Sequence, residues 1–388
     1  MQSSPEILIT SSANALEEVT PPPIRVLYLH HCGAFGGSSR SMMEMIRMFP
    51  AGKVEPLVLT QRGTVEQALH QEGIPYYGVS GVSQFDNTRY SHYRGWRWLV
   101  LLRELAYLPS TVRGLLAVRR RFGIPDLIHV NEVTQLPGIW LAARLFKNVP
   151  IVMHARSVMN TEPCRRTQFM VRLLSRFVKA VVAIDNTVAK SLPAKLPVKV
   201  IHNGLRRPAI LRVADAAPRA FTVAMVGTLA RVKGCIEFVQ AAAICKQRGL
   251  DIRFVFVGAS ARASTGLRQR MLKKLGLSQE IEDELSALIA THQLEGTVHF
   301  HGFTTDLAEI YTAIDVICFP SHYDAPGRPI FEAAFFAVPS IAAVTRPMED
   351  TIIPEKTGIA IRPRSAEELA NAIQRLHDRP DERIRMGI

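Results

Sequence analysis

Short apolar runs typical of strands alternate with helical periodicity along almost the whole chain. Most of these runs are apolar on both faces, as expected for strands of a helix-covered parallel sheet. The predicted strands are residues 25–30, 55–60, 127–131, 150–156, 180–185, 198–203, 221–227, 252–258, 298–302, 315–320, 340–344 and 358–363. Helical patterns between them include 235–248, 307–314, 329–337 and 366–378. The alternation predicts parallel sheets joined by right-handed crossovers.

The alternation breaks once, at residues 206–220, which contain prolines and charges without a clean period. We therefore predict a disordered Ser-, Thr- and Pro-rich tail over 1–23, a first domain over 24–205, a linker over 206–220 and a second domain over 221–388. The predicted fold class is α/β, with two doubly wound, Rossmann-like domains facing each other across a cleft. Ligands of such sheets bind beyond the carboxyl ends of the strands.

Composition limits the class of protein. The chain has 388 residues, of which 47% are hydrophobic, yet its longest unbroken apolar run, Ala333–Val338, is far shorter than a membrane span. The first 23 residues lack a basic start followed by an apolar stretch, so no signal peptide is predicted. Five scattered cysteines without a C-x-x-C pair argue against zinc, redox and disulfide frameworks. These features predict a soluble, cytoplasmic protein.

The charge balance favours an anionic partner. Lys and Arg number 47 against 34 Asp and Glu, which gives +13 at pH 7. No nucleic-acid motif or basic–aromatic interleaving is present, so nucleic acid is not expected. Residues 94–123 combine tryptophans, leucines and a triple arginine, a pattern that fits either peripheral contact with an anionic membrane face or a helix pair packed on the first sheet. The sequence leaves both open.

A glycine-rich segment, HHCGAFGGSSRSMMEM, follows the first predicted strand. Gly36 and Gly37 permit a tight turn, and Ser38 or Ser39 is placed to cap the next helix and leave N–H groups facing an anion. The spacing is not G-x-G-x-x-G, and the second strand ends without an acidic residue, which counts against a nicotinamide dehydrogenase. A purely structural turn remains the alternative.

Two further motifs lie in the second domain. In VGTLARVKG a strand ends at Gly227, and Arg231 and Lys233 precede a helix, an arrangement suited to a diphosphate leaving group. In residues 315–343 a predicted strand leads into a loop that contains Asp324, Gly327 and Arg328. A helix is predicted to follow, with Glu332 in its first turn. A carboxylate there can accept hydrogen bonds from a ribose diol, and N–H groups near Gly327 and Arg328 would face phosphate or sugar oxygens. The alternative is a Glu that only complements its helix dipole. The acidic run 280–285 is interpreted as a solvated helix face.

The second-domain motifs resemble those of GT-B glycosyltransferases of family 4, retaining enzymes that use nucleotide-diphosphate sugars. The family signature has two acidic residues separated by seven, with Gly three positions after the first; Asp324, Gly327 and Glu332 occupy these positions, with Asp replacing the first Glu. The resemblance implies that Asp324 meets the donor sugar, Glu332 binds ribose and Lys233 binds phosphate. Many members carry Arg directly after the first Gly, where this chain has Thr228.

In the first domain the resemblance extends to Gly36–Gly37, to DLIHVN and to IVMHARS, and implies that His154 faces the donor sugar. Arg156 is either a phosphate or acceptor ligand or a surface residue. IHNGL at 201–205 and EKTGIAIRP at 355–363 also match, so the similarity spans about residues 24–388. Members usually continue into a last helix that crosses back to the first domain, and we expect that helix to be missing or truncated here.

These observations predict retaining transfer of a sugar to a hydroxyl of a carbohydrate or lipid-linked acceptor, in polysaccharide or glycolipid biosynthesis, at the inner face of the cell membrane. The expected catalytic residues are Lys233, Arg231, Asp324 and His154. No D-x-D motif occurs, so neither an essential metal nor another cofactor is predicted. The alternatives are an epimerase or phosphorylase on the same scaffold, and a non-catalytic nucleotide- or glycan-binding protein.

Overall fold

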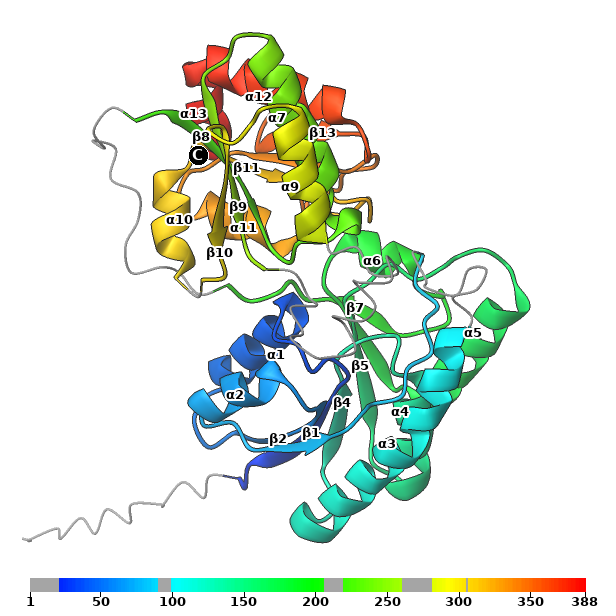
Figure 1. Cartoon of the computed structure of the whole chain (residues 1–388). Coiled ribbons are helices and arrows are strands. Elements are labelled where there is room, and N and C mark those ends of the chain that lie inside the picture. Colours follow the sequence, from blue (N-terminus) through cyan, green and yellow to red (C-terminus); the bar gives the residue numbers. More distant parts are fainter. Residues whose placement is uncertain (1–20, 90–98, 206–218, 260–280, 305) are drawn as a thin grey trace, which may run out of the picture.

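The protein forms two lobes, each built around one parallel sheet (Figure 1). The computed structural model describes residues 21–89, 99–205, 219–259, 281–304 and 306–388. Strand order is β3-β2-β1-β4-β5-β6-β7 in the N-terminal sheet and β10-β9-β8-β11-β12-β13 in the C-terminal sheet. Both orders extend in two directions from a first strand, so each sheet is doubly wound. The predicted fold class is confirmed.

The N-terminal lobe alternates strands and helices. Its strands are β1 (Ile24–His30), β2 (Val54–Gln61), β3 (Tyr76–Val79), β4 (Leu127–Val130), β5 (Ile151–Ala155), β6 (Ala180–Ala183) and β7 (Val198–Val200). Its helices are α1 (Gly37–Met48), α2 (Thr64–Gln71), α3 (Val100–Phe122), α4 (Leu136–Leu145), α5 (Arg165–Phe177) and α6 (Asn186–Ser191).

The C-terminal lobe repeats the pattern. Its strands are β8 (Phe221–Val226), β9 (Ile252–Val257), β10 (Val298–Gly302), β11 (Val316–Phe319), β12 (Ser340–Ala343) and β13 (Gly358–Ile361). Its helices are η2 (Arg231–Lys233, a 3-10 turn), α7 (Cys235–Gln247), α9 (Ile281–Thr291), α10 (Leu307–Ala313), α11 (Arg328–Ala334), α12 (Ala366–Asp378) and α13 (Pro380–Gly387).

All twelve predicted strands are present, with ends within three residues of the prediction. The sequence missed β3, an edge strand of four residues in which only Val79 is buried, so its hydrophobic signal is weak. The predicted tail and linker fall largely on residues 1–20 and 206–218, which lie outside the described residues.

Both faces of each sheet are covered, which is why the strands read as continuous apolar runs. In the N-terminal lobe α3, α4 and α5 cover one face and α1 and α2 the other. In the C-terminal lobe α7, α9 and α12 lie on one face and α10 and α11 on the opposite one. The strand ends and their loops therefore remain for ligand binding. Within the described ranges, no helix is long and apolar enough to cross a membrane.

Polar contacts join the two lobes at the loops that follow the strands. Arg328 at the start of α11 donates to Ser41 Oγ at 2.9 Å and to the carboxylate of Glu44 at 2.5 Å, both on α1. Asp350 Oδ2 accepts a hydrogen bond from the backbone N–H of Asn186 at 2.8 Å and lies 3.0 Å from His202 Nε2. These contacts bring the loops after β11 and β12 against the N-terminal lobe.

Candidate active site

The glycine-rich loop leads from β1 into α1 as predicted, but its serines act differently. Gly36 is the extended N-cap residue, and no side chain caps the helix. Ser39 is buried, and its Oγ lies 2.9 Å from His30 Nε2, so the predicted serine cap is wrong: burial next to an imidazole gives this hydroxyl another partner. A Cβ at Gly36 or Gly37 would meet no atom within 4 Å, so protein packing does not require glycine there.

Four histidines at the ends of β1, β4 and β5, namely His30, His31, His129 and His154, form what we call the histidine cluster. The rings of His129 and His154 lie 5.5 Å apart. Burial, with a smaller effect of the positive charge of Arg156, lowers the pKa of His154 to about 2 and that of His129 to about 3. Both are therefore neutral at pH 7.

His154 is only 5% exposed, and neither ring nitrogen has a hydrogen-bond partner within the described ranges. Buried polar groups are normally hydrogen-bonded. The neutral ring of His154 has one N–H donor and one nitrogen acceptor, and neither is paired with a described residue. A neutral imidazole in that state can bind a ligand hydroxyl. It is a poor general base, because its pKa is far below the working pH.

Arg156, one residue after β5, is held by amides. Its Nε donates to Asn131 Oδ1 at 3.0 Å and its Nη1 to Asn203 Oδ1 at 2.7 Å, while its buried Nη2 has no partner in the described structure. Asn131 also donates to the carbonyl of Ser38 at 3.2 Å, which ties the guanidinium to the start of α1. The sequence left Arg156 undecided, and the asparagines belong to DLIHVN and IHNGL, where no role was assigned to them.

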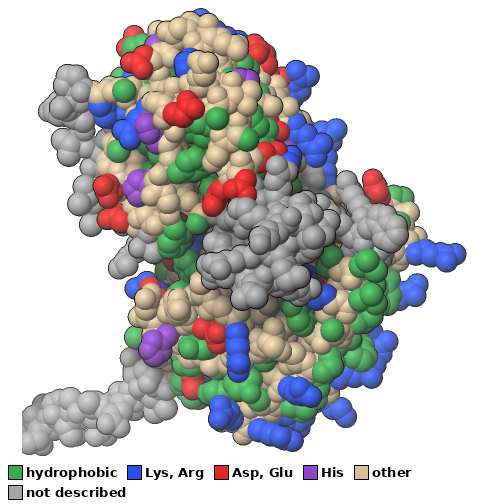
Figure 2. Space-filling view, in the orientation of Figure 1, with side chains coloured by type: hydrophobic (Ala, Val, Ile, Leu, Met, Phe, Trp, Pro, Cys, Tyr) green, Lys and Arg blue, Asp and Glu red, His purple; other side chains and the backbone are tan. Residues whose placement is uncertain are grey.

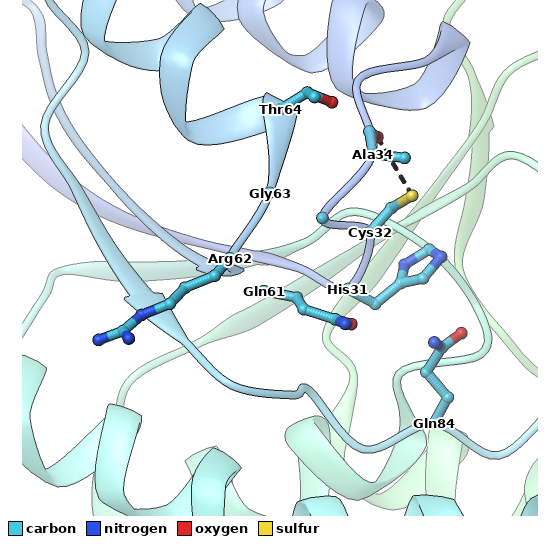
Figure 3. Close-up of a pocket in the computed structure, with 9 residues that line it drawn as sticks. His31, Cys32, Ala34, Gln61, Arg62, Gly63, Thr64 and Gln84 are labelled. Atoms are coloured by element: carbon cyan, nitrogen blue, oxygen red, sulfur yellow. Dashed lines mark hydrogen bonds between the residues drawn. The ribbon is translucent and has the colours of Figure 1, made fainter. Parts of the chain in front are cut away.

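A pocket of about 430 Å³ lies at the carboxyl ends of β1 and β2. Figure 3 shows His31, Gln61 and Gln84 turned toward one another around it, with Arg62 directed away. His31 Nδ1 is buried without a partner, and burial lowers the pKa of His31 to about 4, so the ring is neutral at pH 7. Apart from Arg62, whose side chain points away, the polar groups that line this pocket are uncharged.

In the C-terminal lobe, Lys233 lies at the end of the 3-10 turn that follows β8. Its Nζ is 5.4 Å from the ring centre of Phe319 and 5.1 Å from that of Tyr323, and it forms no ion pair among the described residues. Burial lowers the pKa of Lys233. Gly234 follows in the left-handed region, and a Cβ there would lie 2.1 Å from the Pro320 carbonyl. Glycine therefore lets this turn pack against the loop after β11.

The expected partnership of Arg231 with Lys233 is not what the structure shows. Arg231 is 65% exposed, and its Nη2 lies 2.6 Å from Glu284 on α9. The acidic run that the sequence assigned to a solvated face supplies this partner, because α9 packs beside α7 at the same edge of the lobe. Gly227 directly follows β8 with a φ of 139°, a backbone conformation that favours glycine.

Asp324 lies in the loop between β11 and α11 at a φ of 51°. Its carboxylate accepts hydrogen bonds from the backbone N–H and the hydroxyl of Thr345, each at 2.6 Å, and lies 3.6 Å from Arg89 of the N-terminal lobe. Gly327 follows, and a Cβ there would lie 2.1 Å from Cζ of Phe319. Phe319 thus packs under both Lys233 and the start of α11.

Glu332 is the fifth residue of α11 and lies just past its first turn, because the helix begins at Arg328, one residue earlier than predicted; its placement in the first turn is therefore wrong. Its carboxylate accepts hydrogen bonds from Arg328 Nε at 2.6 Å and Tyr311 OH at 2.9 Å. Arg40 of α1 approaches to 3.9 Å. The acid is therefore oriented by three groups, one of which comes from the other lobe.

The chain matches glycosyltransferase families along nearly its whole length. Residues 35–206 match the model described as Glycosyltransferase Family 4, and residues 207–388 match the one described as Glycosyl transferases group 1. Each half of the chain is thus similar to a glycosyltransferase family model, and the two doubly wound sheets give it the two-lobed GT-B type of fold.

The curated relatives and the solved structures that resemble this chain include glycosyltransferases. The chain is 27% identical to a D-inositol 3-phosphate glycosyltransferase of Pseudarthrobacter chlorophenolicus over 44% of this chain and 37% of that one. It is 27% identical to an alpha-D-kanosaminyltransferase of Streptomyces kanamyceticus over 42% and 38%. It therefore spans under two fifths of the length of these relatives. Anabaena HepE, solved with UDP-glucose, superposes with a TM-score of 0.69 at 21% identity over 94% of this chain and 92% of that one.

Proposed function

We propose that the protein is a retaining glycosyltransferase that moves a hexose-type sugar from a nucleotide-diphosphate sugar to an acceptor hydroxyl. The observation that carries this proposal is the half-buried Lys233, which has no ion pair among the described residues and lies over Phe319 and Tyr323 beside the loop of Asp324 and Gly327. Asp324 and Glu332 approach Arg89 and Arg40 of the N-terminal lobe. HepE, of the same fold, was solved with UDP-glucose, and the two relatives are named as sugar transferases.

In this proposal, the bond between the sugar C1 and the β-phosphate oxygen breaks, and its electron pair leaves with the phosphate. Lys233 stabilises the charge that accumulates there more strongly in the transition state than in the ground state. The acceptor oxygen bonds to C1 on the face that the phosphate leaves, and the phosphate takes the acceptor proton. No protein base is needed, consistent with the neutral, weakly basic His154, which would hydrogen-bond the donor sugar.

The acceptor is proposed to enter from the pocket at the ends of β1 and β2. Its lining of amides and a neutral imidazole suits a hydroxyl-rich carbohydrate or the carbohydrate head of a lipid-linked acceptor. The transfer would serve polysaccharide or glycolipid synthesis. The site chemistry requires no metal, so donor binding should be unchanged by EDTA.

A panel of UDP-, GDP- and ADP-sugars tests the proposal by thermal shift, donor hydrolysis and product analysis. One nucleotide class should stabilise the wild type, and Lys233→Ala and Glu332→Ala should lose most of that shift. Lys53→Ala and Glu295→Ala remove exposed residues of the same types and should retain it. Stabilisation without any sugar transfer would favour a non-catalytic binding protein, and epimerised or phosphorolysed sugar would favour the other enzyme classes.

Peripheral membrane contact through α3 is a second part of the proposal. Leu102 and Leu105 are 63% and 52% exposed, while Leu115 and Val118 are buried against the sheet. Figure 2 shows apolar and Lys or Arg side chains interspersed over the N-terminal lobe. The described part of residues 94–123 forms one helix, Val100–Phe122, and not the helix pair of the packing alternative; its second half packs on the sheet, and its exposed first half is the part that we propose contacts a membrane. Co-sedimentation with anionic vesicles should exceed that with zwitterionic ones, and Leu102→Ser should reduce it.

A further inference from the structure

The positively charged side chains at the turn after β8 do not balance the negative charge of a nucleoside diphosphate. The released diphosphate carries two to three negative charges near neutral pH, yet Lys233 is the unpaired cation at the turn after β8. Arg231 is bound to Glu284, and residue 228 is a neutral threonine. A leaving group of this charge is stabilised by several positioned donors rather than one. The remaining positive charge has to come from another element.

Arg156 has the properties required of that second cation. Two of its nitrogens donate to neutral amide oxygens, of Asn131 and Asn203, which fix the plane of the guanidinium without cancelling its charge. No carboxylate forms an ion pair with it in the described part of the chain, and Nη2 is buried without a partner. A buried guanidinium N–H without an acceptor is destabilising, so an anionic acceptor would complete the arrangement.

The surroundings of Arg156 place that acceptor where the two lobes meet. Asn131 connects the guanidinium to Ser38 in the first turn of α1, a 12-residue helix without a side-chain cap. His154, two residues before Arg156 on the same strand end, is 5% exposed with both ring nitrogens unpartnered. Two neighbouring side chains and a helix terminus therefore lack partners at the same place. Burial, partly offset by the charge of Glu132 and reinforced by the like charge of Arg328 of the other lobe, lowers the pKa of Arg156 to about 10.

We propose that Arg156 binds the β-phosphate of the nucleotide donor from the N-terminal lobe and acts with Lys233 on the leaving group. This inference rests on the proposed function. When the C1–O bond breaks, the electron pair moves onto the β-phosphate oxygen and Nη2 donates a hydrogen bond to the phosphate. Because Arg328 of the other lobe carries the same charge as Arg156, a bound diphosphate also relieves their repulsion, which couples donor binding to the approach of the lobes.

The test measures binding of UDP, GDP and ADP, and of the matching monophosphates, to the full chain by titration calorimetry. Arg156→Gln should weaken binding of the diphosphate that the wild type prefers about 10–100-fold, the value of one charge-assisted hydrogen bond. Binding of its monophosphate, which lacks the β-phosphate, should change less than about twofold. The rate constant for sugar transfer should fall at least as much as diphosphate affinity. Arg172→Gln, which removes an exposed arginine of α5, should leave all of these unchanged.

Arg156→Lys, which keeps the charge and loses the planar fork, should bind the diphosphate with intermediate affinity and keeps the test decisive if the Gln variant does not fold. Equal diphosphate binding by the wild type and the folded Arg156 variants overturns the inference. The same holds if only the KM for the acceptor rises, because Arg156 would then contact the acceptor. If the wild type binds no nucleoside diphosphate, the proposed function itself fails.

Discussion

Gly327 is the position where a single methyl group should disturb both stability and donor binding. A Cβ added there would lie 2.1, 2.4 and 2.7 Å from three ring atoms of Phe319, whereas ordinary contacts begin at 3.4 Å. Either the ring or the start of α11 must therefore move by about 1 Å. Strain of this kind in a packed core costs about 1–3 kcal/mol. Phe319 is also the ring 5.4 Å below Nζ of Lys233, so its displacement shifts the cation.

For Gly327→Ala we expect a fall in the melting temperature of the C-terminal lobe of about 2–4 °C per kcal/mol and a weaker response to nucleoside diphosphate. The assay is differential scanning fluorimetry with and without ligand, together with urea unfolding. Gly296→Ala is the control, because a Cβ there meets no atom within 4 Å. Identical behaviour of the two variants would refute the packing argument.

The remaining predictions concern the pH dependence of stability, the ion pair of Arg231 and the hydrogen bond of Tyr311. Below about pH 6.5 a histidine in the unfolded chain binds a proton, whereas His31, His129 and His154 stay neutral in the folded protein. The free energy of unfolding should therefore fall as the pH falls, by up to about 1.4 kcal/mol per pH unit for each of these groups. Urea unfolding at pH 7.5, 6 and 5 measures this, and His154→Gln should lower the slope by about one proton. Arg231→Ala breaks an exposed pair and should change stability by less than about 1 kcal/mol in the same urea assay and diphosphate affinity by less than about twofold in calorimetry. Tyr311→Phe removes a hydrogen bond to Glu332 and should destabilise the C-terminal lobe by about 1–3 kcal/mol in urea while weakening donor binding.

Each of these has a distinct contrary result. A stability that does not change between pH 7.5 and 5 contradicts the neutral state of the cluster. Loss of diphosphate binding in Arg231→Ala would return that residue to the site beside Lys233. A Tyr311→Phe protein with wild-type stability and affinity would show that the phenol does not orient Glu332.

Much of the fold could be predicted because burial on both faces leaves a local trace. Strands such as 221–226 and 252–257 are apolar at all but one position each, and they are followed by Gly227 and Gly258, whose positive φ other residues rarely adopt. The edge strand β3 left no such trace. Motif spacing likewise located Lys233, Asp324 and Glu332 in the segments that follow β8 and β11, since the fold places ligand sites at strand ends.

The contacts between side chains that are distant in the sequence could not be predicted from local sequence patterns. The partner of Arg231 is Glu284, 53 positions away, and that of Arg328 is Glu44, in the other lobe. The amides that hold Arg156 come from the ends of two other strands. The sequence by itself determined the alternation of strands and helices and the residue types available at each strand end, because hydrophobic periodicity and backbone preferences act over a few residues. Only the tertiary structure decided which charges are paired and which stay unpaired, because pairing depends on distances between segments that no local pattern encodes.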